Sequence, residues 1–172
     1  MNGRITRRAM MSSDMEFLCT LYATTRADEL ATVDWTDDQK AAFVIHQFNA
    51  QHEHWQANYS DTSWDVILLD DEPIGRLYVA RWANEIRVVD IALMPQYRNT
   101  GIGTRLFREI FDEADSTGRS VSIHVEMFNP ARRLYERLGF VQAEERGVYL
   151  LMERPLHGSA VTAELETLTT GL

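Results

Sequence analysis

The stretch QYRNTGIGTRLF, residues 96–107, places two glycines at the start of a predicted helix. A strand that enters a helix through such a turn leaves unpaired amide N–H groups at the positive end of the helix dipole. Gly101 and Gly103 remove side chains that would block an approaching anion, and Arg98 adds a positive charge. The stretch predicts a phosphate-binding loop, although the same glycines would also suit a tight turn that binds nothing.

The residues around these glycines exclude two common phosphate-binding motifs. A P-loop requires Gly-Lys-Ser/Thr, whereas Thr104 and Arg105 follow Gly103. The dinucleotide fingerprint requires a third glycine three residues after Gly103, and this position holds Leu106. A phosphate bound at this loop would therefore belong to another kind of ligand.

Hydrophobic periodicity on both sides of the loop predicts the element order β-α-α-β-β-β-α-β-α-β-β. Ser13 with Glu16, and Thr36 with Gln39, have the form of capping boxes and predict the starts of the first two helices. The strand patterns lie near residues 4–10, 65–70, 74–82, 85–95, 120–128, 141–145 and 148–153, and the later helices near residues 101–118 and 129–140.

The length and composition indicate one globular domain. The chain has 172 residues, enough for one core, with 45% hydrophobic and 25% charged residues. We predict a single domain over residues 1–154. Residues 155–172 lack a core stripe, so we predict a tail there that is mobile or binds a partner.

The charge and the cysteine count narrow the possible partners. A formal net charge of −9 argues against binding to duplex nucleic acid and favours cationic substrates such as amines. The single cysteine, Cys19, excludes an internal disulfide framework and fits a reducing cytoplasm. No apolar run is long enough for a membrane span, and His46, His52 and His54 lack metal-ligand spacing, so we expect neither a membrane segment nor a bound metal.

Two motifs carry a family resemblance. Arg98-Asn99-Thr100-Gly101-Ile102-Gly103 resembles the R/Q-x-x-G-x-G/A signature of the GCN5-related N-acetyltransferases. Residues 129–140, NPARRLYERLGF, are similar to the second family signature, N-x-x-A-x-x-L-Y-x-x-x-G-F. The resemblance extends over residues 4–154 and implies an α/β (α+β) fold in which helices flank a mixed, mostly antiparallel, splayed sheet.

The resemblance also implies how acetyl-CoA would bind. The loop would hold the pyrophosphate, and backbone N–H groups at the end of the preceding strand would polarise the thioester carbonyl. The residues implied are Leu93, Met94, Arg98, Asn99, Thr100, Gly101, Ile102, Gly103, Thr104, Asn129 and Tyr135.

Acetyl transfer to an amine needs a proton donor for the leaving thiolate. The phenol of Tyr135 suits this role because its pKa near 10 keeps it protonated at neutral pH, and the resemblance implies the same role. An ordinary core tyrosine on an amphipathic helix is the alternative.

The amine must also lose a proton, and the sequence leaves several bases open. Similar proteins carry a glutamate on the strand before the loop, where this chain has Arg87 and Val89. Strand alternation places Ser122, His124 and Glu126 on one polar face. The candidates are therefore His124, Glu126 and Asp90, or a relay of water molecules.

These observations predict an enzyme that transfers acetyl from acetyl-CoA directly to a primary amine within a ternary complex. The acceptor can be a small molecule, a protein N-terminus or a lysine, and a homodimer is common among similar proteins. The alternative from another class is an acyl-CoA-binding sensor or scaffold without turnover.

Overall fold

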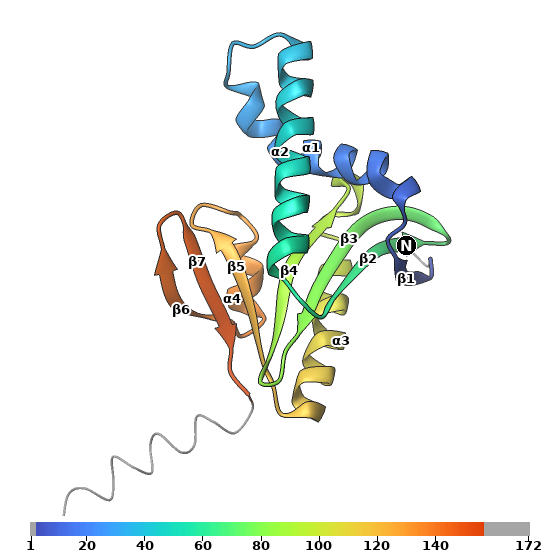
Figure 1. The fold of residues 1–172 in the computed structure, drawn as a ribbon. Helices are drawn as coiled ribbons and strands as arrows, with labels where there is room; N and C mark the ends of the chain where they lie inside the picture. The colour runs from blue at the N-terminus through green and yellow to red at the C-terminus, as the bar shows by residue number, and fades with distance from the viewer. Residues whose placement is uncertain (1–2, 157–172) are drawn as a thin grey trace, which may run out of the picture. The chain divides into compact units, whose positions relative to one another are not determined.

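The computed structural model describes residues 3–156, in which seven strands form one mixed sheet in the order β1-β2-β3-β4-β5-β7-β6 (Figure 1). The predicted element order is confirmed, with two added 3₁₀ helices, η1 (Ser12–Asp14) and η2 (Pro95–Tyr97). The strands are β1 (Ile5–Ala9), β2 (Thr62–Leu69), β3 (Glu72–Arg81), β4 (Glu85–Leu93), β5 (Ser120–Glu126), β6 (Val141–Arg146) and β7 (Tyr149–Arg154). The helices are α1 (Met15–Ala31), α2 (Asp37–Asn58), α3 (Ile102–Thr117) and α4 (Arg132–Arg137).

The chain divides into two compact units, which are described separately. The first comprises the described residues up to Ala80 together with Val89–Gly103, and the second comprises Arg81–Val88 together with the described residues from Thr104 onward. The single domain over residues 1–154 stays a prediction. Of the predicted tail, residues 157–172 lie outside the described residues.

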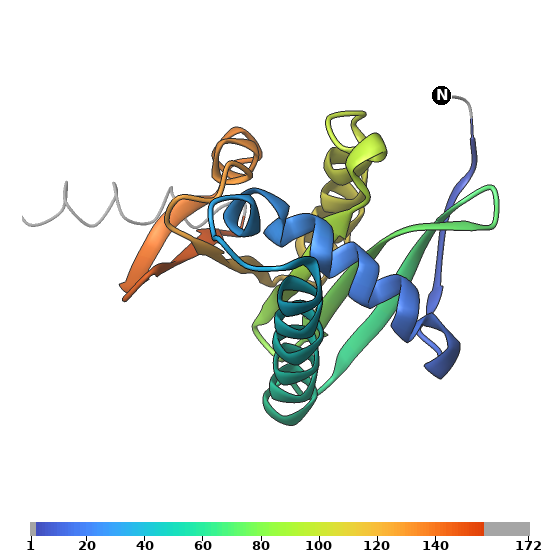
Figure 2. The ribbon, with the colours of Figure 1, turned by 90° about the horizontal axis from the view of Figure 1, so that it is seen from above.

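In the first unit, α1 packs across α2, as Figures 1 and 2 both show. The predicted capping box at the start of α2 is confirmed: Gln39 N–H donates to Thr36 Oγ1 at 3.2 Å, and Thr36 N–H donates to Gln39 Oε1 at 2.9 Å. Such a reciprocal cap satisfies two amides that have no partner within the helix. The buried side chains shared by the two helices are Leu18, Tyr22, Leu30, Val44 and Phe48.

The predicted capping box of α1 is wrong. The helix begins at Met15, and Asp14 takes the cap position in place of Ser13. The Asp14 carboxylate accepts two 2.7 Å bonds from Arg8 and a third from the Met11 N–H, and the arginine lowers its pKa. The carboxylate thus caps the short helix η1 through the Met11 N–H, and it makes no side-chain cap bond to α1.

One glycine sets the spacing between β3 and the end of β4. A Cβ added at Gly75 would lie 2.4 Å from the Ala92 carbonyl oxygen and 2.8 Å from Leu93 Cδ2. Met94 N–H donates to Ile74 O at 2.8 Å directly beside this contact. The absence of a side chain at Gly75 therefore allows the end of β4 to lie against β3.

We expect Gly75→Ala to lower the free energy of unfolding by about 3 kcal/mol, because the added methyl meets backbone on β4 and cannot rotate away. Urea denaturation measures this change. Gly118→Ala is the matched control: Gly118 has φ 66° and open space around its Cβ position, so this change costs only the positive-φ strain, about 1 kcal/mol. Equal losses in the two variants would contradict the close approach at Gly75.

In the second unit, β5 lies between β4 and β7. It runs parallel to β4, in a register that includes Glu85 opposite Ser120 and Val88 opposite Ile123, and antiparallel to β7. Val121, Ile123 and Val125 of β5 are buried, as the alternation predicts. The aromatic core of this unit consists of Phe107, Phe111, Tyr135 and Phe140, whose rings contact one another.

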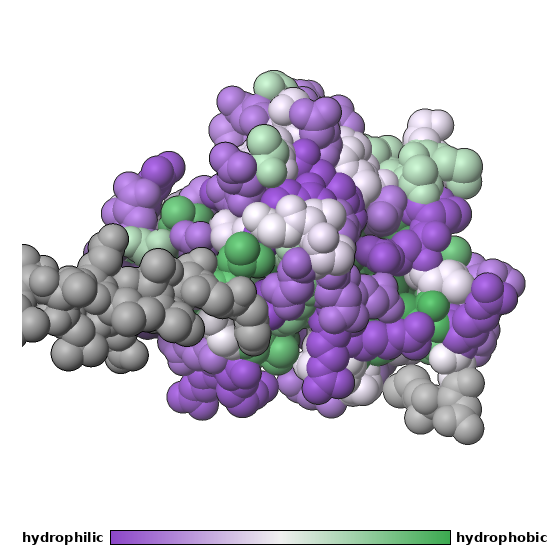
Figure 3. All heavy atoms as spheres, turned by 90° about the horizontal axis from the view of Figure 1, so that it is seen from below, coloured by the Kyte–Doolittle hydropathy of each residue, from purple (hydrophilic) through white to green (hydrophobic). Residues whose placement is uncertain are grey.

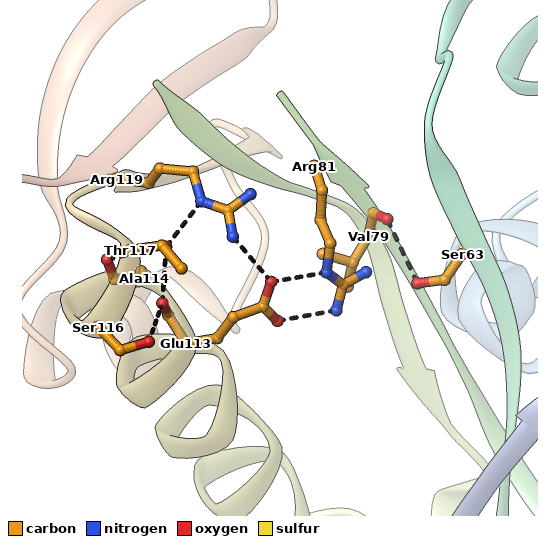
Figure 4. A network of polar contacts seen from close by, with 8 residues as sticks. All are labelled: Ser63, Val79, Arg81, Glu113, Ala114, Ser116, Thr117 and Arg119. Carbon is orange, nitrogen blue, oxygen red and sulfur yellow. Dashed lines mark hydrogen bonds and ion pairs between the residues drawn. The ribbon is translucent and has the colours of Figure 1, made fainter. Parts of the chain in front are cut away.

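Charged contacts hold the last turns of α3 (Figure 4). Glu113 accepts hydrogen bonds from Arg81 at 2.8 and 3.0 Å and from Arg119 at 3.0 Å. The hydrogen bond from Arg81 is the main cause that lowers the pKa of Glu113, so the carboxylate stays ionised. The ionised carboxylate ties α3 to Arg81, at the end of β3, and to Arg119, which follows the helix.

The exposed surface agrees with the composition. The face in Figure 3 is mostly hydrophilic, with hydrophobic residues in small separate areas. Within residues 3–156, none of the helices has both the length and the apolar character needed to cross a membrane.

Candidate active site

The predicted phosphate loop lies between β4 and α3. Two of its residues have left-handed backbone, Asn99 with φ 59° and Gly101 with φ 87°, and a Cβ added at Gly101 would meet no atom within 4 Å. Helix α3 starts at Ile102 and has no acidic residue in its first turn. The first amides of a helix have no partner within it, so this turn offers N–H donors and a positive dipole end to an anion.

Arg98 links the loop to its surroundings. Its Nε donates to the Leu93 carbonyl oxygen at 2.9 Å, and its Nη2 donates to Thr24 Oγ1 on α1 at 2.7 Å. Thr100 Oγ1 donates to Tyr97 O at 2.6 Å within the same loop. Arg98 is exposed, and its guanidinium both braces the loop and adds to the positive potential there.

The two predicted carbonyl-polarising amides differ. The N–H of Met94 donates to Ile74 O and is therefore used by the sheet. Adjacent N–H groups of a strand point to opposite edges, so the N–H of Leu93 points away from β3. The structure thus separates Leu93 from Met94 as a donor to a ligand.

Asp90 is bound to a buried arginine. Asp90 Oδ2 accepts from Arg76 Nε at 2.7 Å, and Arg76 is 2% exposed. The guanidinium carbon of Arg76 lies 5.1 Å from the ring centroid of Trp55 and 5.3 Å from that of Tyr78. Burial raises the pKa of Tyr78 to about 12, so its hydroxyl stays neutral. Asp90 therefore balances a buried cation.

We expect Asp90→Asn to lower the free energy of unfolding by about 3 to 5 kcal/mol, because it leaves the charge of Arg76 buried without a counter-ion. The double variant Arg76→Met with Asp90→Asn removes both charges and should recover most of this loss. Chemical denaturation of the two single variants and the double variant measures the coupling. Additive losses would show that the two side chains do not compensate each other.

The second unit holds a polar cluster around Arg87. Arg87 donates to Glu85 Oε1, from Nε at 2.8 Å and from Nη2 at 2.6 Å, and it also bonds to Ser122 Oγ. Ser122 Oγ donates in turn to Glu85 Oε1. His124 completes the cluster, with its Nδ1 3.2 Å from Arg87 Nη1. Ser122 is 2% exposed, so the polar face of β5 is buried at this position.

The environment of His124 disfavours its charged form. Burial is the main cause that lowers the pKa of His124, and the positive charges of Arg87 and Arg146 lower it further. The carboxylates of Glu85 and Glu144 oppose this shift. His124 is therefore neutral at pH 7 and is a weaker base than an ordinary histidine.

Three other predicted site residues lie around α4. Glu126 ends β5, opposite Tyr149 of β7. Asn129 Oδ1 accepts the Ala131 N–H at 2.9 Å and so shapes the turn that leads into α4. Tyr135 is 5% exposed, and its ring contacts Phe107 and Phe140. The ring thus packs in the core, as the alternative interpretation expects.

Of the three histidines of α2, His46 and His54 are exposed and His52 is half-buried. The His52 ring stacks on Phe48 and meets Trp64 edge-on. Burial lowers its pKa. In the part of the chain that the structure describes, no three His, Cys, Asp or Glu side chains form a group that could hold a metal ion.

Three contacts in these sites were not predicted from the sequence: Arg76 with Asp90, Arg87 with His124, and Thr24 with Arg98. Arg87 was noted only as the residue that replaces a glutamate. Arginines in the middle of strand patterns were the available signal, since a buried guanidinium needs a counter-ion and hydrogen-bond acceptors.

In this mixed sheet, strand β4 leads through a loop with two left-handed residues into the first turn of α3, which is suited to an anion. Residues 25–140 match the Acetyltransferase (GNAT) family. The chain belongs to this family, and the resemblance seen in its two motifs is confirmed.

Relatives and solved structures agree with this assignment. The chain is 33% identical over 121 residues to mycothiol acetyltransferase of Corynebacterium glutamicum, an alignment that covers 67% of the chain and 40% of the relative. The chain therefore spans less than half the length of this curated relative. The fold is similar to that of the PaiA N-acetyltransferase of Thermoplasma acidophilum in complex with coenzyme A, with TM-score 0.66, 18% identity, and coverage of 88% and 99%. It is also similar to that of the ribosomal-protein-S18-alanine N-acetyltransferase of Escherichia coli, with TM-score 0.58, 18% identity, and coverage of 91% and 97%.

Proposed function

We propose that this chain transfers the acetyl group of acetyl-CoA directly to a primary amine in a ternary complex. The observation that carries the proposal is the loop from Arg98 to Gly103, with left-handed backbone at Asn99 and Gly101 before the first turn of α3. Such a turn suits a pyrophosphate. Family membership and the coenzyme A complex of the similar Thermoplasma protein support the same cofactor.

In the proposed reaction the neutral amine attacks the thioester carbonyl carbon, the C–S bond breaks, and the amine nitrogen loses one proton. The Leu93 N–H donates to the carbonyl oxygen, where negative charge develops. The leaving thiolate takes a proton from the Tyr135 hydroxyl, the tyrosinate regains one from solvent, and the proton of the amine is released to solvent, so that free coenzyme A and an amide are formed.

The contacts of two predicted bases argue against their use. Asp90 balances Arg76, and Nδ1 of His124 faces the Arg87 guanidinium. Glu126 and a water relay remain as the two proposed routes for the amine proton. Conversion by Glu126→Gln at the wild-type rate, with an unchanged pH profile, would leave the water relay.

The acceptor is proposed to be a small amine, a protein N-terminus or a lysine. Incubation with isotope-labelled acetyl-CoA and an amine library, including mycothiol-related amines and N-terminal peptides, tests activity and identifies the acceptor. Binding of coenzyme A without label transfer to any amine would favour the sensor alternative. A reducing cytoplasm and a homodimer are part of the same proposal, the first because of the single cysteine, Cys19.

We expect Gly103→Val to weaken coenzyme A binding about tenfold or more, equal to about 1.4 kcal/mol, because the side chain would stand in the first turn of α3 where the pyrophosphate is proposed to bind. Calorimetric titration with coenzyme A measures the change. Gly103→Ala is the control for helix propensity and should bind more tightly than the valine variant. Wild-type affinity in a folded Gly103→Val protein would defeat the assignment of the loop.

We expect Tyr135→Phe to reduce turnover about a hundredfold while acetyl-CoA affinity stays unchanged, because only the proton donor is lost. The phenyl ring keeps the contacts with Phe107 and Phe140. Steady-state kinetics and a melting curve on the same preparation separate catalysis from stability. Normal turnover in this variant would return Tyr135 to a purely structural role.

A further inference from the structure

The guanidinium of Arg87 is fixed from several sides. Glu85 binds its Nε and Nη2, Ser122 bonds to the same Nε, and the Trp82 ring lies 5.4 Å from its central carbon. The side chain is 11% exposed. A planar guanidinium held at two nitrogens and over a ring cannot turn, so the direction of its remaining Nη1 is set.

This fixed donor determines which nitrogen of His124 carries the proton. Arginine has five N–H donors and no acceptor, so a hydrogen bond from Nη1 to Nδ1 requires the lone pair of Nδ1. The neutral imidazole then carries its hydrogen on Nε2. Protonation of Nδ1 would place two N–H groups and two positive charges against each other.

We propose that Arg87 is a positioning residue that holds His124 in the neutral Nε2–H form, so that His124 donates a hydrogen bond to an oxygen atom of the bound substrates and is not the base. This role rests on the proposed acetyl transfer.

The other nitrogen of His124 supports the donor role. Among residues 3–156, Nε2 of His124 is one of two buried side-chain nitrogen or oxygen atoms that have no hydrogen-bond partner. An unpaired buried N–H costs roughly 1 to 3 kcal/mol, and a substrate oxygen placed there would recover this energy. The oxygen has two possible sources: a carbonyl or carboxylate next to the amine of the acceptor, or the thioester carbonyl of acetyl-CoA.

The charges around His124 favour a neutral or weakly polar contact. Glu85 on β4 neutralises Arg87, and Glu144 on β6 pairs with Arg146 at 2.8 Å. These four groups are the charged neighbours that act on the ring. Because these four groups form two ion pairs, they leave no net charge beside His124. The ligand is therefore selected by the N–H donor at Nε2 and not by charge.

Long-range ¹H–¹⁵N correlation spectra of histidine-labelled protein test the tautomer without any need for activity. The expected wild-type result is one His124 species with a bare Nδ1 and a protonated Nε2 at pH 7. In Arg87→Gln we expect mixed tautomers and a higher His124 pKa, and in Arg87→Lys, which keeps a cationic donor, a partial return to the wild-type pattern. A protonated Nδ1 in the wild type, or one unchanged tautomer in Arg87→Gln, overturns the proposal.

Two substitutions of His124 separate a donor from a base. His124→Gln keeps an N–H donor and removes basicity, so it should lose less than about tenfold in kcat/KM. His124→Glu restores a base and removes the donor, so it should lose about a hundredfold or more. The reverse order of the two losses would make His124 the base and overturn the proposal.

Two comparisons show which substrate supplies the oxygen that His124 contacts: one between two amine acceptors, and one between acetyl-CoA and coenzyme A. If the oxygen belongs to the acceptor, His124→Phe should lower kcat/KM for an amino-acid amide at least about tenfold more than for an alkylamine of equal length. If it belongs to the thioester, His124→Phe should weaken acetyl-CoA binding but not coenzyme A binding. No difference in either pair overturns the donor role. Lack of transfer by the wild-type protein to every amine would refute the proposed function, and the spectra would still decide the tautomer.

Discussion

The buried guanidinium of Arg76 is the constraint on which the geometry of the first unit depends. A charge that is 2% exposed must have a counter-ion, and Asp90 supplies it from β4 at 2.7 Å. Gly75, the residue before Arg76, allows the Ala92 carbonyl to come close. The ion pair and the close approach together fix the end of β4, and so the position of Leu93 and the start of the loop.

Arginines of the second unit also have carboxylate counter-ions. The chain contains sixteen arginines and one lysine, and arginines on β3, β4 and β7 each pair with a carboxylate: Arg81 with Glu113, Arg87 with Glu85, and Arg154 with Asp115. The planar fork of arginine suits such partly buried pairs better than an ammonium does. Asp90, a carboxylate that the sequence offers as a base, is likewise the counter-ion of a buried arginine, Arg76.

Local sequence patterns were enough to predict the fold. The site was harder to predict because its residues contact side chains that are distant in the sequence. Strand alternation and helical periodicity gave the element order, and the Thr36 cap was readable because both of its partners lie three residues apart. Asp14, which Arg8 binds from outside the helix, stands at the start of α1 where a Ser13 cap was expected. The contacts of Asp90 and His124 are with Arg76 and Arg87, which lie 14 and 37 residues away in the sequence, and no local spacing encodes those contacts.

The pairing of charges also explains how an acidic chain can offer a site for an anion. A net charge of −9 opposes phosphate binding at long range, but that field is screened within about 8 Å at physiological salt. At the loop, the nearest groups are the exposed Arg98 and the N–H groups of a helix start without acidic residues. Short-range donors thus decide what can bind at the loop, and under the proposed function the acidic balance of the chain would favour the approach of a cationic amine.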